Sequence, residues 1–186
     1  MLREMADLLV LDLVEKGLVT DQIVITVGYD IENLTDPVRR SQYRGAITTD
    51  AYGRVVPAHS HGTHNLGRFT SSTKLILQAV TELSDRLVDM NLLVRRLNIV
   101  VNHVVPEDKA PQQDQSMQQL DLFTDYEAED ARKQEEQKEL AKERKMQQAM
   151  LSIRGKFGKN AILRGMNLEE GATTRDRNEQ IGGHKA

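Results

Sequence analysis

The sequence QIVITVGY, residues 22–29, contains the clearest strand pattern in the chain. Ile23, Ile25 and Val27 alternate with Val24, Thr26 and Gly28, and β-branched side chains predominate. Alternation with a period of two, together with β-branched residues, is typical of a strand with one buried face. We therefore predict a half-buried strand against which neighbouring apolar segments pack.

An amphipathic helix is predicted before this strand, over residues 2–16. At helical spacing, its apolar side collects Leu2, Ala6, Leu9, Val10 and Leu13. Gly17 is a suitable stop, because glycine favours the left-handed conformation that follows many helices.

Two more strands and a second helix are predicted after it. Residues 63–70 and 95–105 have strand character, and Ser71 or Ser72 offers a hydroxyl N-cap to a helix that ends near Val88. Between the first strand and the strand at residues 63–70, residues 44–57 fit a short hairpin with its turn at residues 50–53. This order predicts an α+β fold, a small antiparallel sheet with two helices on one face. It is a split βαβ pattern without its first strand, so we expect a fragment or a shortened reading frame.

The apolar content falls sharply after Val105, and we divide the chain into four parts. Residues 1–105 form the predicted domain, and residues 106–125 form a polar linker. Residues 126–154 predict a charged helix whose apolar positions are sparse, so we expect it to be solvated or a weak partner helix. Residues 155–186 contain little periodicity, and we expect a largely disordered, flexible tail.

The composition also excludes several classes of protein. The chain of 186 residues has a formal charge of −3 and no cysteine, which excludes disulfides, cysteine zinc sites and a cysteine nucleophile. No apolar run approaches the roughly 20 residues of a membrane helix. The start is not a signal peptide, because Asp7 and Asp12 interrupt its apolar stretch. We expect a cytoplasmic protein.

Three histidines, His59, His61 and His64, lie close together in the sequence. Three imidazoles could bind zinc, and a metal-dependent hydrolase is one hypothesis that follows. The cluster contains no cysteine and no acidic ligand, so we expect a structural or DNA-facing loop and no metal.

The pentapeptide Gln119, Leu120, Asp121, Leu122 and Phe123 follows the polar linker. Its apolar side chains have no periodic apolar neighbours, so they need a surface elsewhere to cover them. That surface belongs either to a partner or to the chain's own domain.

Four stretches in this order resemble the C-terminal part of Y-family translesion DNA polymerases. They are residues 6–30, residues 62–76, the pentapeptide QLDLF and residues 158–186. The resemblance is to the UmuC/ImpB/UvrX-like DNA repair proteins of Gram-positive bacteria. It implies that residues 2–105 form a little finger domain, which lies along the template–primer duplex. It also implies that QLDLF docks on the bacterial sliding clamp (the beta subunit), with its Gln in a polar pocket and Leu122 and Phe123 in an apolar cleft.

The family's palm domain, which carries the acidic ligands of two metal ions, lies upstream of the little finger and is not part of this sequence. Mg²⁺ therefore belongs only to the full-length parent enzyme, and we expect no cofactor and no polymerase activity here. The resemblance implies a DNA- and clamp-binding fragment that acts in translesion synthesis, damaged-DNA binding and the SOS response.

Two groups of residues are candidates for DNA contacts. The first is the loop of residues 36–68, in which Arg39, Arg40, Arg44 and Arg54 can neutralise phosphates or can be ordinary surface arginines. Arg68, at the end of this loop, is a further candidate. The second is a run at a predicted helix N-terminus, where an anion is favoured or where hydroxyls simply cap the helix. That run is Thr70, Ser71, Ser72, Thr73 and Lys74.

Two further alternatives stay open. The chain could be a non-catalytic interaction protein that works only through the clamp peptide and the tail. It could also be one subunit of a split polymerase, in which an upstream fragment supplies the palm and the missing strand, because unpaired strands seek partners.

Overall fold

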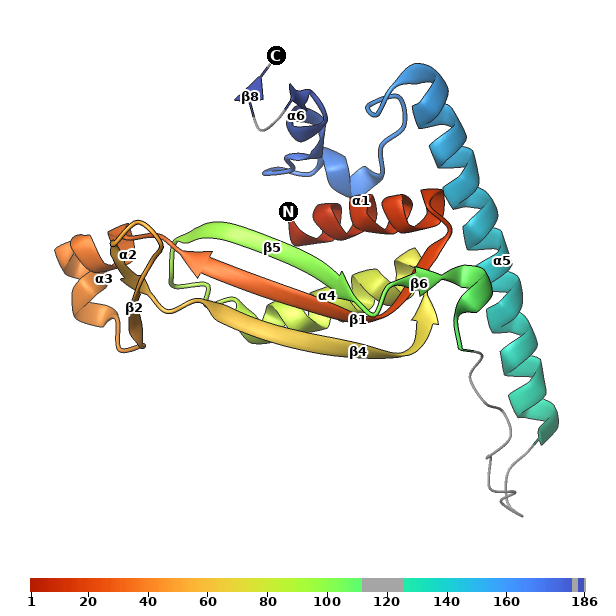
Figure 1. The fold of residues 1–186 in the computed structure, drawn as a ribbon, viewed down its shortest axis with the longest axis horizontal. Coiled ribbons are helices and arrows are strands. Elements are labelled where there is room, and N and C mark those ends of the chain that lie inside the picture. Colours follow the sequence, from red (N-terminus) through yellow and green to blue (C-terminus); the bar gives the residue numbers. More distant parts are fainter. Residues whose placement is uncertain (112–125, 182–183, 186) are drawn as a thin grey trace.

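The structure is a computed structural model that describes residues 1–111, 126–181 and 184–185 (Figure 1). The pentapeptide Gln119–Phe123 lies outside the described residues.

The central strand, β1 (Leu18–Tyr29), lies between β4 (Ser60–Thr70) and β5 (Val94–Asn102), and it is antiparallel to both. Ile25 is opposite Gly62 on one side and Ile99 on the other. A short strand, β6 (Val105–Pro106), pairs with the beginning of β1. The predicted antiparallel sheet is confirmed, and β1 begins four residues earlier than the alternation at residues 22–29 indicated.

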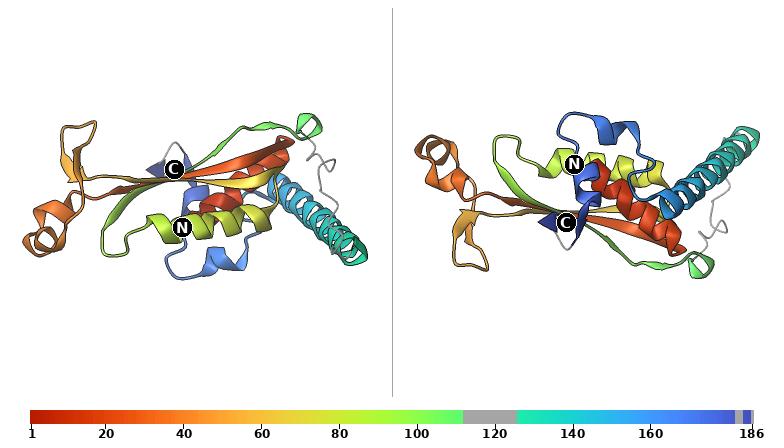
Figure 2. Two further views of the ribbon diagram at one scale, coloured as in Figure 1. Left: turned by 90° about the horizontal axis from the view of Figure 1, so that it is seen from below. Right: turned by 90° about the horizontal axis from the view of Figure 1, so that it is seen from above.

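Two helices, α1 (Leu2–Glu15) and α4 (Thr73–Leu87), cover one face of this sheet, as Figure 2 shows. The core forms where the inward side chains of β1 meet those of both helices. It includes Ile23, Ile25 and Val27 with Val10, Leu13, Ile76, Val80 and Leu83. At Gly62 the helix approaches the strand so closely that a Cβ would lie 3.0 Å from the Leu87 side chain, so glycine permits this packing.

One end of the sheet, where β1 ends at Tyr29, carries two short helices and the predicted hairpin (Figure 1). The helices are α2 (Glu32–Thr35) and α3 (Pro37–Gln42), and the hairpin consists of β2 (Ile47–Thr49) and β3 (Val55–Pro57). Asp50 fixes the turn, because its Oδ1 accepts hydrogen bonds from the backbone N–H groups of Tyr52 (2.9 Å) and Arg54 (3.0 Å). Gly53 supplies the positive φ of 75°.

The third predicted strand, residues 95–105, is divided in two. His103 has a φ of 52°, which interrupts the extended backbone between β5 and β6. A 3-10 helix, η1 (Glu107–Lys109), follows β6.

The charged helix is present as α5 (Tyr126–Phe157), but the expectation that it is solvated is wrong for its second half. Gln147 and Met150 are buried, and Leu151 packs against the core of the domain. Figure 1 shows α5 lying across the end of the sheet that is opposite to the hairpin. The helix therefore belongs to the same folded unit as the sheet.

The tail contains little regular structure, as expected, but several of its described residues are held against α1 (Figure 1). Its short elements are η3 (Gly165–Leu168), α6 (Thr174–Asn178), β7 (Gln180–Ile181) and β8 (His184–Lys185). Asn167 and Thr174 are buried, and both donate to the buried carboxylate of Glu4. These contacts order part of a segment that we expected to be largely disordered.

Candidate nucleic-acid interface

The face of the sheet opposite to α1 and α4 is open and polar. It comprises Gln22, Val24 and Thr26 of β1, His61, Thr63 and Asn65 of β4, and Arg96, Asn98, Val100 and Asn102 of β5. Hydrogen bonds run across the strands: Gln22 Nε2 donates to Asn65 Oδ1 (2.8 Å), and Asn102 Nδ2 donates to Gln22 Oε1 (2.8 Å). This arrangement presents amides and hydroxyls on both sides of Val24 and the exposed Val100, and these polar groups can form hydrogen bonds with a polar partner.

A cavity of about 400 Å³ lies between this face and the hairpin. Its lining includes Arg54, Arg95, Arg96 and His59. The guanidinium of Arg54 lies 5.1 Å from the centre of the Tyr52 ring, and its Nε donates to Asp50 Oδ2 at 2.8 Å. This hydrogen bond raises the pKa of Arg54 and fixes its orientation, so the hairpin presents a positioned cation beside the sheet.

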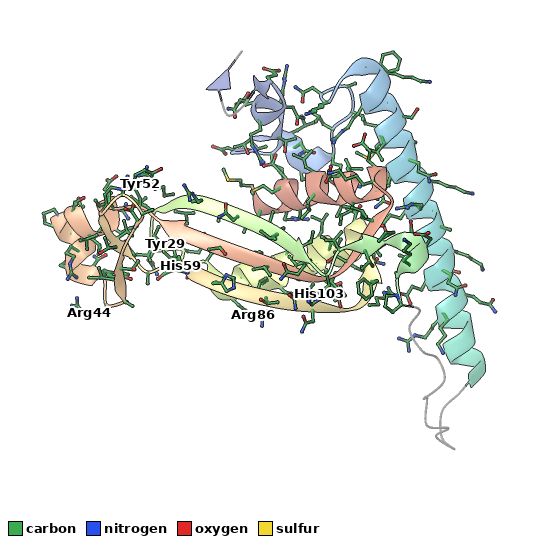
Figure 3. The ribbon with its side chains drawn as sticks, viewed as in Figure 1. Tyr29, Arg44, Tyr52, His59, Arg86 and His103 are labelled. Carbon is green, nitrogen blue, oxygen red and sulfur yellow. The ribbon has the colours of Figure 1, made fainter. Side chains whose placement is uncertain are left out.

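Except for Arg68, the first group of predicted DNA-binding residues lies at this same end of the sheet. Arg39 and Arg40 are on α3, whose N-cap Asp36 accepts a hydrogen bond from Arg39 N at 2.8 Å. Arg40 and Arg44 are exposed. Figure 3 shows Arg44 at the outer edge of this end, and its guanidinium donates to the backbone oxygen of Ser41 at 2.7 Å. The three arginines therefore extend the positive charge of the cavity lining.

The second predicted group lies at the opposite end of the sheet, beside α5 (Figure 1). The side chains of Thr70, Ser71, Ser72 and Thr73 are buried, and Ser72 caps α4 by accepting from Leu75 N. Arg68, predicted with the arginines of the first group, lies here instead and pairs with Glu136, and Lys74 pairs with Glu139. The structure thus separates the two groups, and α5 covers the second.

The model of the impB/mucB/samB family C-terminal domain matches residues 1–122, about two thirds of the chain. The chain belongs to this family. No curated protein and no solved structure matches it. The match includes the whole sheet, α1 and α4, and it places the chain with the C-terminal regions of Y-family translesion polymerases. This confirms the resemblance to the C-terminal part of Y-family translesion polymerases.

The histidines of this impB/mucB/samB C-terminal domain do not converge. His61 lies on the open face and bonds to Thr26 Oγ1 through Nδ1 (3.0 Å), whereas His64 is opposite the core residue Ile23 in the register. His59 precedes β4 and lines the cavity. Within the described residues, no group of three or more His, Asp or Glu residues is placed to hold a metal ion. The metal-site hypothesis therefore has no geometric support there.

Several residues of the open face were missed in the sequence. Arg96, Asn98 and Asn102 occupy alternate positions of β5, and Gln22 and Thr26 occupy alternate positions of β1. This period of two in polar residues was the signal that could have identified the face.

The described helices of the domain include none that is long and apolar enough to cross a bilayer.

Proposed function

We propose that this chain binds duplex DNA through the open face of its sheet and the arginines at the hairpin end. The observation that carries the proposal is a polar sheet face bordered by Arg54, Arg95 and Arg96 in a member of this family. Arginines neutralise phosphates, and amides and hydroxyls bond to phosphate, sugar or base edges. The setting is DNA repair, with translesion synthesis and the SOS response as its specific form, in the cytoplasm.

We also propose that the chain docks on the bacterial sliding clamp through Gln119–Phe123. Support comes from the sequence alone: an apolar pair and an aromatic residue in a polar segment need an outside surface. DNA binding and clamp binding together would keep the chain at the replication fork.

The chain itself is proposed to have no polymerase activity. Two-metal nucleotidyl transfer requires carboxylates that converge on a pair of ions. In the family that the chain resembles, those carboxylates belong to the palm domain and not to the little finger, which supports this proposal. An upstream polymerase fragment remains a candidate partner under the split-polymerase alternative.

Reversing two charges at the hairpin end tests the proposed DNA interface. An Arg39→Glu, Arg40→Glu variant is expected to bind duplex DNA more weakly, because it loses phosphate contacts and adds repulsion. Each lost contact reduces the slope of log K against log[salt] by about 0.9. Fluorescence anisotropy with a labelled duplex at several salt concentrations measures both quantities.

The matched control is Arg3→Glu, Lys156→Glu, which makes the same change in net charge. Arg3 is exposed on α1, which covers the other face of the sheet, and Lys156 is exposed in the last turn of α5. Equal affinities of the two variants would show that only the total charge matters, and they would overturn the assigned interface.

A further inference from the structure

Three glutamates of α5 face the beginning of α4. Glu136, Glu139 and Glu143 are spaced three and four residues apart, which places their side chains on one side of the helix. A cavity of about 450 Å³ lies between the two elements, and all three glutamates line it together with Arg68 and Lys74. The acidic side of α5 therefore lies against one of the two predicted DNA-binding surfaces.

Glu143 occupies the position of an anion at the α4 N-terminus. Its Oε2 accepts a hydrogen bond from Ser72 Oγ (2.7 Å), and its Oε1 accepts one from Lys74 N (3.0 Å). The free N–H groups and the dipole at a helix N-terminus favour a negative group at this place. The carboxylate thus makes the contacts that a phosphate oxygen would make there.

The two cations of the same surface are also paired with α5. Lys74 Nζ lies 2.9 Å from Glu139 Oε2, and this hydrogen bond raises the pKa of Lys74. Arg68 forms an ion pair with Glu136. A phosphate that approached Lys74 or Arg68 would have to replace a carboxylate of the chain itself.

Buried contacts one turn further along α5 hold the acidic side in place. Gln147 Nε2 donates to Ser71 O (3.0 Å) and to Thr73 Oγ1 (2.9 Å), and Gln147 is only 1 % exposed. Arg144 donates to Ser71 Oγ at 3.1 Å and pairs with Glu107. In contrast, the Lys74–Glu139 pair is well exposed, and exposed pairs contribute little to stability. The buried hydrogen bonds of Gln147 therefore hold α5 on the domain, whereas a phosphate can replace the carboxylate in the exposed ion pair.

We propose that α5 is an intramolecular competitor of nucleic acid, which covers Arg68, Ser72 and Lys74 with carboxylates in the free chain. The inference rests on the proposed DNA binding and specifies how that binding is limited. With α5 in place, phosphates reach the open face and the hairpin end only. When the carboxylates are removed or displaced, Arg68 and Lys74 add two phosphate contacts.

The test is a Glu136→Gln, Glu139→Gln, Glu143→Gln variant, which keeps the size of each side chain and removes its charge. It is expected to bind a labelled duplex about tenfold more tightly at about 0.1 M salt, with a log K against log[salt] slope steeper by about 1.8, because two phosphate contacts are added. Thermal unfolding checks that the variant is folded. The single variant Glu139→Gln, which alters only the exposed pair with Lys74, is expected to give part of the gain without affecting the fold.

A control with the same change in net charge is Glu135→Gln, Glu169→Gln, Glu170→Gln. These three glutamates are exposed and make no described contact with Arg68 or Lys74. An equal gain in both triple variants would overturn the inference, since general electrostatic attraction would then explain it. No gain in the α5 variant, in a chain whose wild type binds duplex, would overturn the inference and leave the proposed function intact.

The effect of Lys74→Gln, compared between the wild type and the α5 triple variant, is a second test that a general effect of net charge would not reproduce. In the wild type, where Glu139 already neutralises Lys74, this change is expected to alter duplex affinity less than twofold. In the α5 triple variant it is expected to remove about half of the gain on a logarithmic scale. Equal effects of Lys74→Gln in both backgrounds would contradict the inference. Absence of duplex binding in every form would overturn the proposed function, and the inference with it.

Discussion

A Leu122→Ala, Phe123→Ala variant is expected to lose detectable binding to the bacterial sliding clamp. A short peptide of this kind binds at about micromolar affinity, which corresponds to about 8 kcal/mol in total. Removing two buried apolar anchors typically costs several kcal/mol, because such anchors carry most of the binding energy. Isothermal titration calorimetry with purified clamp and the full chain measures the loss directly.

The chain offers a matched control of the same chemistry. Phe157 and Leu168 are 75 % and 73 % exposed, and both lie outside the pentapeptide. A Phe157→Ala, Leu168→Ala variant is expected to bind the clamp like the wild type. If this control lost binding and the pentapeptide variant retained it, the docking segment would be the tail and not QLDLF.

The second large effect is expected at Glu4, where a single carboxylate connects α1 to the tail. Four donor groups converge on it: the backbone N–H groups of Thr173 and Thr174, the Thr174 hydroxyl at 2.8 Å, and the side-chain amide of Asn167. In a Glu4→Gln variant, an NH₂ group would face some of these donors. We expect a loss of about 3 kcal/mol in the free energy of unfolding, because buried donors are left unsatisfied. We also expect faster hydrogen exchange in residues 164–178.

Glu15→Gln is the control, since Glu15 is exposed at the end of the same helix. It is expected to change the free energy of unfolding by less than about 0.5 kcal/mol. If Glu4→Gln and Glu15→Gln had the same effect, the tail would not depend on the buried carboxylate. Chemical denaturation and hydrogen exchange on each variant give the comparison.

The contribution of Glu4 is expected to depend on pH in a defined direction. Burial raises the pKa of the Glu4 carboxyl, but the hydrogen bonds from Thr174, Thr173 and Asn167 outweigh it and lower the pKa from 4.5 to about 2. A carboxyl whose pKa is lower in the folded state stabilises that state above its unfolded pKa. The stability difference between the wild type and Glu4→Gln should therefore be full above about pH 4.5 and should shrink as the pH falls towards 2. A difference that stayed constant over this range would contradict the assignment.

The sequence predicted the sheet and its two helices because their residues repeat with clear periods. Ile23, Ile25 and Val27 alternate along β1 and are fully buried, and Ser72 caps α4 as one of two predicted hydroxyls. The hairpin turn was also predicted, because Asp50 and Gly53 are residue types with specific turn geometry.

The packing of α5 could not be predicted in this way. Its anchor is Gln147, a polar residue whose burial depends on two partners more than seventy positions earlier, Ser71 and Thr73. A pattern of apolar residues gives no indication of a contact between polar side chains. The same limitation hid the tail contacts, because Glu4 and Thr174 are 170 positions apart and neither is apolar.

The division of β5 and β6 has a different cause. It depends on the left-handed backbone of His103, a residue type that does not require this conformation. Of the candidate DNA-binding residues, the sequence identified arginines by composition. It did not show that Arg68 and Lys74 face the carboxylates of α5, which only the tertiary arrangement reveals.

η1 and α5, which precede and follow the pentapeptide in the sequence, are both anchored on the domain that contains the sheet. Glu107 of η1 pairs with Arg144 of α5, and its backbone N–H donates to Gly17 O at 2.9 Å. Gln119 is eight residues beyond Pro111, and Phe123 is three residues before Tyr126. At no more than about 3.6 Å per residue, any chain spans at most about 29 Å over eight residues and about 11 Å over three residues. If QLDLF binds the clamp and the sheet binds DNA, as proposed, the two partners are tethered to one chain. The effective concentration of DNA near the clamp would then be high, on the millimolar scale of short tethers. Each macromolecule would then increase the residence time of the other without any contact between them.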